Sequence, residues 1–147
     1  LKGIPEEDWQ YGENASWLYY LFPNVQLGGG GHDANLIKIY PDPKNPGRSI
    51  TKVNHYFSQE FIDYVSQVPD DGKSAYDKDR NPSLDGVVEV FDTTIEQEDY
   101  LMGETTQKSA ETGIVKEFIF GRNEPALHHY HNTFREALNL PPLEKVG

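Results

Sequence analysis

The chain has 147 residues, enough for one domain, and carries a formal net charge of −11 and no cysteine. The excess of acidic residues disfavours nucleic acid and anionic membranes as partners. A basic protein or a neutral ligand is a more suitable partner for a chain of this charge. Without cysteine, the chain cannot form disulfides, zinc–thiolate sites, a catalytic thiol or a cysteine-ligated iron–sulfur cluster. No apolar run approaches the ~20 residues of a membrane span, and no signal peptide is visible, so we expect a cytoplasmic protein.

The first half of the sequence predicts an antiparallel meander of three strands. The first is aromatic and continues past Pro23, and its unbroken apolar character suggests that both faces are covered. A polar loop precedes it, and turns rich in glycine and proline separate the strands. The loop is 1–14, the strands are 17–27, 35–40 and 49–57, and the turns are 28–31 and 41–47.

The second half predicts helices. Ser58 can cap a short helix, and after a polar loop Ser83 can cap a long one that ends at Gly113. In the alternative, 87–91 is a strand and the helix starts near Thr93, at a sequence resembling a capping box. The remaining expected segments are a short helix at 59–66, a loop at 68–82, a strand or extended link at 114–120 and a helix at 124–138.

The long helix carries an apolar stripe with an acid on it. At helical spacing the stripe contains Val88, Phe91, Ile95 and Met102, and Asp99 falls between the last two. A carboxylate that faces a core must be paired, hydrogen-bonded, metal-bound or protonated, because an isolated buried charge is too costly. The spacing therefore leaves two interpretations of Asp99 open: a metal ligand or general base, or a carboxylate held by an arginine or tyrosine elsewhere.

Other candidate sites are weaker. The glycine run 28–31 lacks the Lys-Ser/Thr of a phosphate loop and opens onto a strand, so we interpret it as a hairpin turn. His128, His129 and His131 match no established ligand spacing, and we interpret them as a surface or interface patch. His32 and His55 have no partner visible in the sequence. The chain offers no Ser/His/Asp arrangement and no Gly-x-Ser-x-Gly motif.

Four segments together carry a family pattern. They are Tyr19–Asn24; Ile39–Pro41 with the Pro-Gly-Arg-Ser that follows; Glu98–Tyr100 with Gln107; and Phe120–His128. Over most of the 147 residues, they resemble the C-terminal part of the catalytic domain of the large (alpha) subunit of Rieske-type aromatic-ring-hydroxylating oxygenases. The resemblance implies a single α+β domain over 1–147, with an antiparallel sheet packed on a long helix in a helix-grip (START-like) fold, and an incomplete one.

The resemblance also implies chemistry. Members hold iron(II) with two histidines and one carboxylate, and Asp99 with Gln107 matches the family's spacing, which favours Asp99 as the iron ligand with Gln107 in a supporting role. The two histidine ligands and the Rieske 2Fe-2S cluster are not on this chain. The expected substrate-pocket residues are Phe91, Ile95 and Met102 on the helix and, on the first strand, Trp17, Tyr19 and Leu21 or the residues that alternate with them.

We therefore expect part of a non-heme iron dioxygenase acting in aromatic hydrocarbon catabolism. The implied partners are the missing N-terminal part of the large subunit, a ferredoxin or reductase, a small apolar substrate and, by analogy, a homotrimer. Because one carboxylate cannot hold iron(II) tightly, we expect the isolated chain to be inactive. The alternative is a non-enzymatic helix-grip module that binds an apolar ligand without metal, and a regulatory protein using the acidic surface ranks last.

Overall fold

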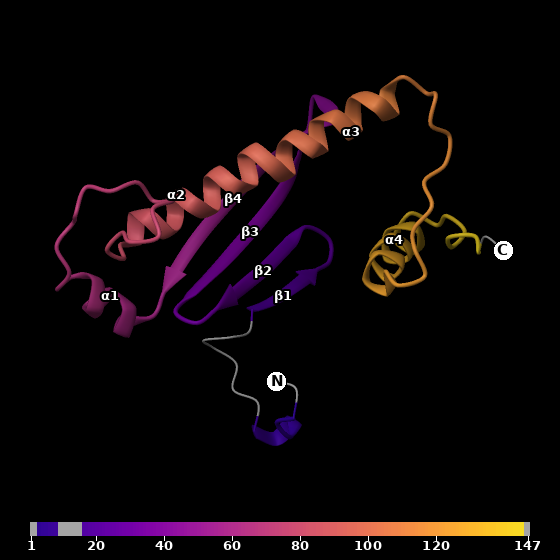
Figure 1. Ribbon diagram of the computed structural model, residues 1–147. Coiled ribbons are helices and arrows are strands. Elements are labelled where there is room, and N and C mark those ends of the chain that lie inside the picture. Colours follow the sequence, from indigo (N-terminus) through magenta and orange to yellow (C-terminus); the bar gives the residue numbers. More distant parts are fainter. Residues whose placement is uncertain (1–2, 9–15, 146–147) are drawn as a thin grey trace.

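A computed structural model describes residues 3–8 and 16–145 (Figure 1). Its centre is a four-stranded antiparallel sheet in the order β1-β2-β3-β4, so that each strand pairs with the next along the chain. A short 3-10 helix, η1 (Glu6–Asp8), precedes the sheet. The strands are β1 (Ser16–Leu21), β2 (Val25–Gly30), β3 (Asp33–Asp42) and β4 (Asn45–Phe57).

The sheet corrects three expectations. The first predicted strand is a hairpin: Pro23 lies in the turn, and Val25 pairs back with Leu21. The glycine run is mostly strand, because Gly28 pairs with Leu18 on one side and Asn35 on the other. The long ladders outweigh the turn preference of consecutive glycines, and the chain reverses at 31–32. The expectation that both faces of the first strand are covered is also wrong, since most of β1 is exposed.

The predicted single long helix is confirmed, and the alternative strand at 87–91 is wrong. Ser83 caps the helix through its Oγ, which accepts a hydrogen bond from the Gly86 backbone N–H at 3.1 Å. Gly113, with φ +66°, follows its end. The helix runs through three segments: α2 (Leu84–Thr94), a π-helical segment η2 (Ile95–Tyr100) and α3 (Leu101–Glu111).

Two shorter helices flank this arrangement. α1 (Gln59–Val65) follows β4 and is capped by Ser58, as predicted. α4 (Pro125–Ala137) is the last helix. The segment at 114–120 before it has no regular structure, so the extended link predicted there is confirmed and the alternative strand is wrong. Among the described residues, no helix is long and apolar enough to cross a membrane.

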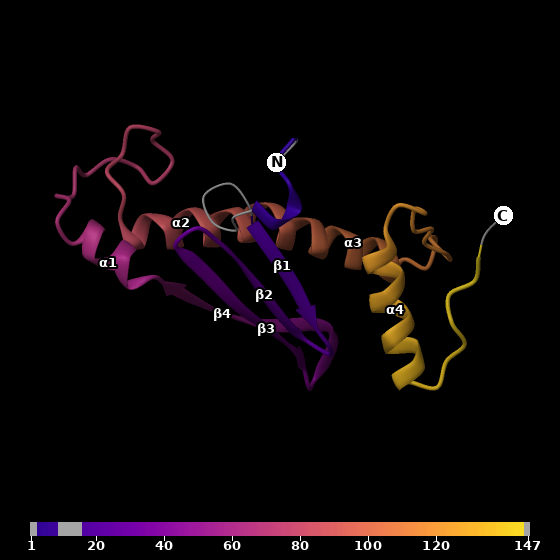
Figure 2. The same ribbon diagram turned by 90° about the horizontal axis from the view of Figure 1, so that it is seen from below.

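The long helix crosses one face of the sheet (Figures 1 and 2). Leu18, Gly28, Asn35 and His55 are successive cross-strand partners and share that side, which we call the inner face. The His55 ring contacts Phe91 of α2 at a centroid distance of 5.2 Å, which orients the inner face toward the helix. The fold is therefore α+β with a helix-grip-like arrangement, as predicted.

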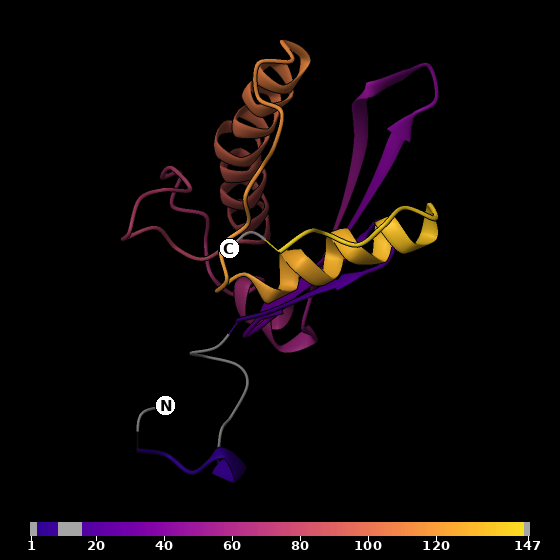
Figure 3. The same cartoon turned by 90° about the vertical axis from the view of Figure 1, so that its right-hand side faces the viewer.

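α4 covers the same face near β1 (Figure 3). Tyr20, two residues after Leu18, meets Tyr130 edge to face at 4.7 Å. Partial burial and the hydrogen bond between the two hydroxyls raise the pKa of Tyr20 above its usual value. Tyr20 also donates to the carbonyl of Pro23 at 2.6 Å, so this tyrosine ties the first hairpin to α4.

The described part of the chain has a thin core. No hydrophobic side chain within it is fully buried, and the buried polar residue is Asn35, at 7% exposure. A domain whose apolar side chains remain partly open gains less from the hydrophobic effect than a closed one.

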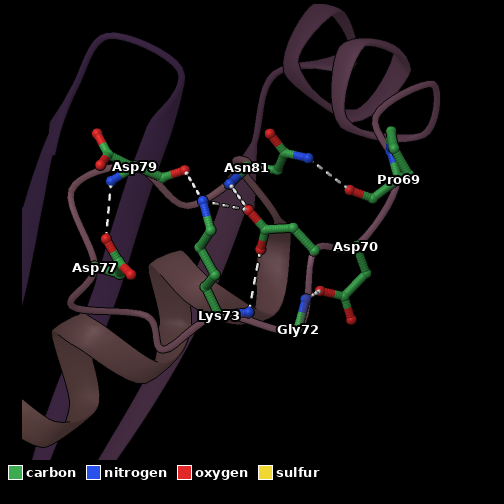
Figure 4. Close-up of polar contacts among 8 residues, drawn as sticks. Pro69, Asp70, Gly72, Lys73, Asp77, Asp79 and Asn81 are labelled. Atoms are coloured by element: carbon green, nitrogen blue, oxygen red, sulfur yellow. Dashed lines mark hydrogen bonds and ion pairs between the residues drawn. The ribbon is translucent and has the colours of Figure 1, made fainter.

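The loop leading into α2 is held by polar contacts that involve Lys73, Asp79 and Asn81 (Figure 4). The Asp71 carboxylate accepts hydrogen bonds from the backbone N–H groups of Asn81 and Lys73, at 2.9 and 3.1 Å. The Lys73 ammonium lies 3.4 Å from the same carboxylate and donates to the Asp79 carbonyl. The hydrogen bond from Asn81 is the main cause that holds the pKa of Asp71 below its usual value, with desolvation opposing it.

Candidate functional site

A cleft of about 1010 Å³ lies between the inner face of the sheet and the long helix. The sheet contributes residues from β1, β2 and β3, and the long helix contributes the side chains of Phe91, Ile95 and Asp99. The main side chains that line it are Leu18, Gln26, Asn35, Ile37, Phe91, Ile95 and Asp99. A largely apolar cleft with a few polar groups suits a small ligand with an apolar body.

The glycines of β2 keep the floor of this cleft low. Gly28 lies on the inner face, where an added Cβ would approach Leu18 Cδ1 to 3.2 Å. Any side chain there would push Leu18 aside and fill space above the strand. The run that the sequence suggested as a turn therefore shapes the cleft.

Asp99 lies in the π-helical segment of the long helix. Ile95, the first residue of that segment, and Asp99 both line the cleft. A π-helical turn is wider than an α-helical one and is often found at functional sites. Asp99 is exposed, and its carboxylate makes no hydrogen bond or ion pair with any residue that the structure describes. The helix thus presents a free carboxylate to the cleft.

A comparison with family models identifies the chain. The model of the ring-hydroxylating alpha subunit (catalytic domain) matches residues 2–140. The chain belongs to this family. The searches of curated proteins and of solved structures returned no match.

Three of the predicted pocket residues border the cleft. Phe91 and Ile95 face it from the helix, and Trp17 borders it from β1. The indole ring of Trp17, however, packs over Gly29 and contacts Tyr19 at 5.7 Å, on the opposite, outer face of the sheet.

The other three predicted pocket residues lie elsewhere. Tyr19 and Leu21 are 60% and 48% exposed on the outer face, because alternation along β1 places Leu18 and Tyr20 on the inner one. Met102 is 64% exposed, one helical segment beyond the cleft. Gln107 donates to Glu111 Oε1 at 3.0 Å beside the β3–β4 hairpin, not to Asp99.

Two histidines that had no partner in the sequence acquire one in the structure. His32 borders the cleft, and its Nδ1 lies 3.2 Å from Ser58 Oγ. His55 Nε2 lies 3.2 Å from Asp92 Oδ1 on α2. Strand alternation alone could place His55 on one face with Val53, but only the register places that face under the helix.

The histidines of α4 pack on an aromatic ring. His131 stacks on Phe120 with ring centroids 4.6 Å apart, and His128 meets the same ring at 6.4 Å. This packing joins the extended link at 114–120 to α4.

The described residues do not form a complete metal site. No group of three histidine, cysteine, aspartate or glutamate side chains among them is placed to hold a metal ion. Asp99 has the chemistry of one ligand, an anionic oxygen donor open to the cleft, but the two imidazoles of a two-histidine, one-carboxylate site are not beside it. No reaction step through iron can be derived from these residues alone.

Proposed function

We propose that the chain forms part of the catalytic domain of a Rieske-type oxygenase that hydroxylates an aromatic or other apolar substrate with dioxygen. The observation that carries the proposal is the free carboxylate of Asp99 at an apolar cleft, in a chain whose residues 2–140 match the family. Membership alone implies an oxygenase component, while the ligand and pocket roles are our inference.

In this proposal Asp99 supplies the carboxylate ligand of iron(II), and the rest of the large subunit supplies two histidines. Bound iron would activate dioxygen. Phe91, Ile95 and Leu18 hold the apolar body of the substrate and exclude water, so that the ring lies beside Asp99. Met102, Tyr19 and Leu21 take no part.

The remainder of the large subunit also completes the packing. Many apolar side chains of the described residues stay exposed, among them Ile114 at 82% and Ile119 at 77%, and β1 and β4 are the two edges of the four-stranded sheet. Burying such surface and pairing such edges is what a further part of the same domain provides. Electrons come from a ferredoxin or reductase through a Rieske cluster outside this chain, and we expect the isolated chain to be inactive.

The test is substrate-dependent oxygen uptake by the full-length large subunit with its electron donor, using a panel of mono- and bicyclic aromatic hydrocarbons. Asp99→Ala should lower uptake and hydroxylated product at least about 100-fold, the lower range for losing a group that acts directly in catalysis. The matched control is Glu104→Ala, an exposed acid on the same helix that pairs with Lys108 at 3.6 Å, and it should retain activity. Equal activity of the two variants would contradict the proposal.

The second candidate is a helix-grip module that binds an apolar ligand without metal. The incomplete ligand set among the described residues favours it. It predicts that an aromatic probe binds equally well to wild type and Asp99→Ala, with no oxygen uptake by either.

A further inference from the structure

His55 is a strand residue that contacts the long helix at two neighbouring positions. It lies on the inner face of β4, and its side chain is 13% exposed. Its ring meets the Phe91 ring edge to face at a centroid distance of 5.2 Å, and its Nε2 lies 3.2 Å from Asp92 Oδ1. Because an ionised carboxylate can only accept hydrogen bonds, His55 donates from Nε2. One strand side chain thus holds two consecutive residues of the helix.

The two contacts together fix the rotation of the helix about its own axis. Consecutive residues point about 100° apart around an α-helix. A contact with Phe91 alone would let the helix roll on the sheet, whereas the added hydrogen bond to Asp92 selects one orientation. At the other end of the helix, Gln107 and Glu111 approach Gly47 with long, exposed side chains, which constrain rotation less. Apolar packing does not replace the anchor, because no hydrophobic side chain among the described residues is fully buried.

The placement of Asp99 depends on this orientation. Its carboxylate makes no hydrogen bond or ion pair with any described residue, so its direction follows that of the helix. It lies seven residues after Asp92, about two turns further along, and lines the cleft with Phe91 and Ile95. A roll of the helix would therefore carry these side chains away from the cleft together.

We propose that His55 is a positioning residue that sets the orientation of the long helix through Phe91 and Asp92 and thereby keeps Asp99 at the cleft. This inference rests on the proposed function, in which Asp99 acts at the cleft. The two contacts have separable roles. The ring contact holds Phe91 as a wall of the cleft and supports binding, while the hydrogen bond to Asp92 orients the helix and supports the reaction beside Asp99. A displacement of about 1 Å at the reacting groups can lower a rate about 100-fold, even when the change that causes it lies far from the chemistry.

The test is steady-state oxygen uptake by the full-length large subunit with its electron donor, using the hydrocarbon of the panel that wild type oxidises fastest. Asp92→Ala keeps the Phe91 contact but removes the acceptor, so kcat should fall about tenfold while KM changes less than about twofold. Asp92→Asn retains Oδ1 as an acceptor and should restore kcat to near the wild-type value. His55→Ala also loses the ring contact and should raise KM in addition to lowering kcat.

The matched control is Glu89→Ala, which should keep the wild-type kcat and KM. Glu89 is an exposed acid of α2 whose side chain makes no hydrogen bond or ion pair with any described residue. Because the Asp92 side chain is 54% exposed, Asp92→Ala should melt within about 2 °C of wild type, so that a lower rate does not reflect unfolding.

The outcomes separate the two proposals. If wild type is active, equal kcat values for Asp92→Ala and Glu89→Ala would refute only the role of His55, as would a loss in Asp92→Ala that Asp92→Asn does not restore. Absence of oxygen uptake by wild type with every hydrocarbon of the panel would refute the proposed function and this inference with it.

Discussion

The two halves of the long helix, α2 and α3, are each 11 residues long but are buried differently. In α2, the apolar side chains are half-buried, and Phe91 and Asp92 contact His55 of β4. In α3, every residue is exposed, including Leu101 at 55% and Met102 at 64%. α3 reaches the sheet through polar side chains, with Gln107 and Glu111 beside the β3–β4 hairpin.

The apolar stripe is therefore half-buried along α2 and exposed along α3. Phe91 and Ile95 have β-strand residues across the cleft, whereas Met102 continues the same stripe without a described residue to cover it. Asp99 lies at the boundary, in the π-helical segment between the halves. The acid therefore lies at the open end of the half-buried region.

The largest expected contrast compares one apolar truncation in each half. Phe91→Ala should lower the free energy of unfolding by about 2 kcal/mol, less than for a fully buried phenylalanine, because Phe91 is only half-buried. Met102→Ala should change it by less than about 0.5 kcal/mol. Urea denaturation followed by circular dichroism checks both values, and equal losses would break the comparison.

The start of the covered half offers the next contrast. Ser83→Ala removes the cap on the Gly86 N–H and should cost about 1 kcal/mol. Ser109→Ala in α3 removes a hydroxyl that only donates to the Thr105 carbonyl, and should cost close to nothing. The same denaturation experiment compares the two serines, and a larger loss for Ser109→Ala would contradict the assignment of α2 as the anchored half.

The elements were more predictable than their pairing. The long helix, the Ser83 cap and the antiparallel sheet follow from apolar spacing and capping chemistry, which act locally. The hairpin at Pro23 and the strand character of Gly28 depend on cross-strand ladders that override local turn preference. A local sequence pattern does not show whether the cross-strand ladder or the turn preference prevails.

The candidate site was predictable only in part. Spacing and the family resemblance singled out Asp99, and the helical stripe singled out Phe91 and Ile95, which face the cleft. For β1 the sequence left open whether Tyr19 or its alternates form the pocket wall, because alternation divides the strand into two faces without saying which one the helix covers; in the structure Leu18 borders the cleft. The role of His55 was missed, since its partners lie on a helix that is distant from it in the sequence.

The smallest expected effect concerns the loop that leads into α2. The pKa of Asp71 is held below its usual 3.8 in the folded protein, so its contribution to stability is complete above that value and is lost as pH falls through the folded pKa. Asp71→Asn should therefore lower the melting temperature slightly at pH 7 and flatten its decline below about pH 4. Melting curves from pH 2 to 7 check this, with Asp79→Asn as control, since the Asp79 side chain makes no hydrogen bond with any described residue. An identical pH profile for both variants would contradict the role of Asp71.

The most direct test of the central claim is the mononuclear iron content of the full-length large subunit, measured by metal analysis with the Rieske iron counted separately. Asp99 is a free carboxylate at the cleft, so Asp99→Ala should lose the mononuclear iron while keeping the cluster. Glu104→Ala, on the exposed half of the same helix, should keep both. Full mononuclear iron in Asp99→Ala would contradict the account.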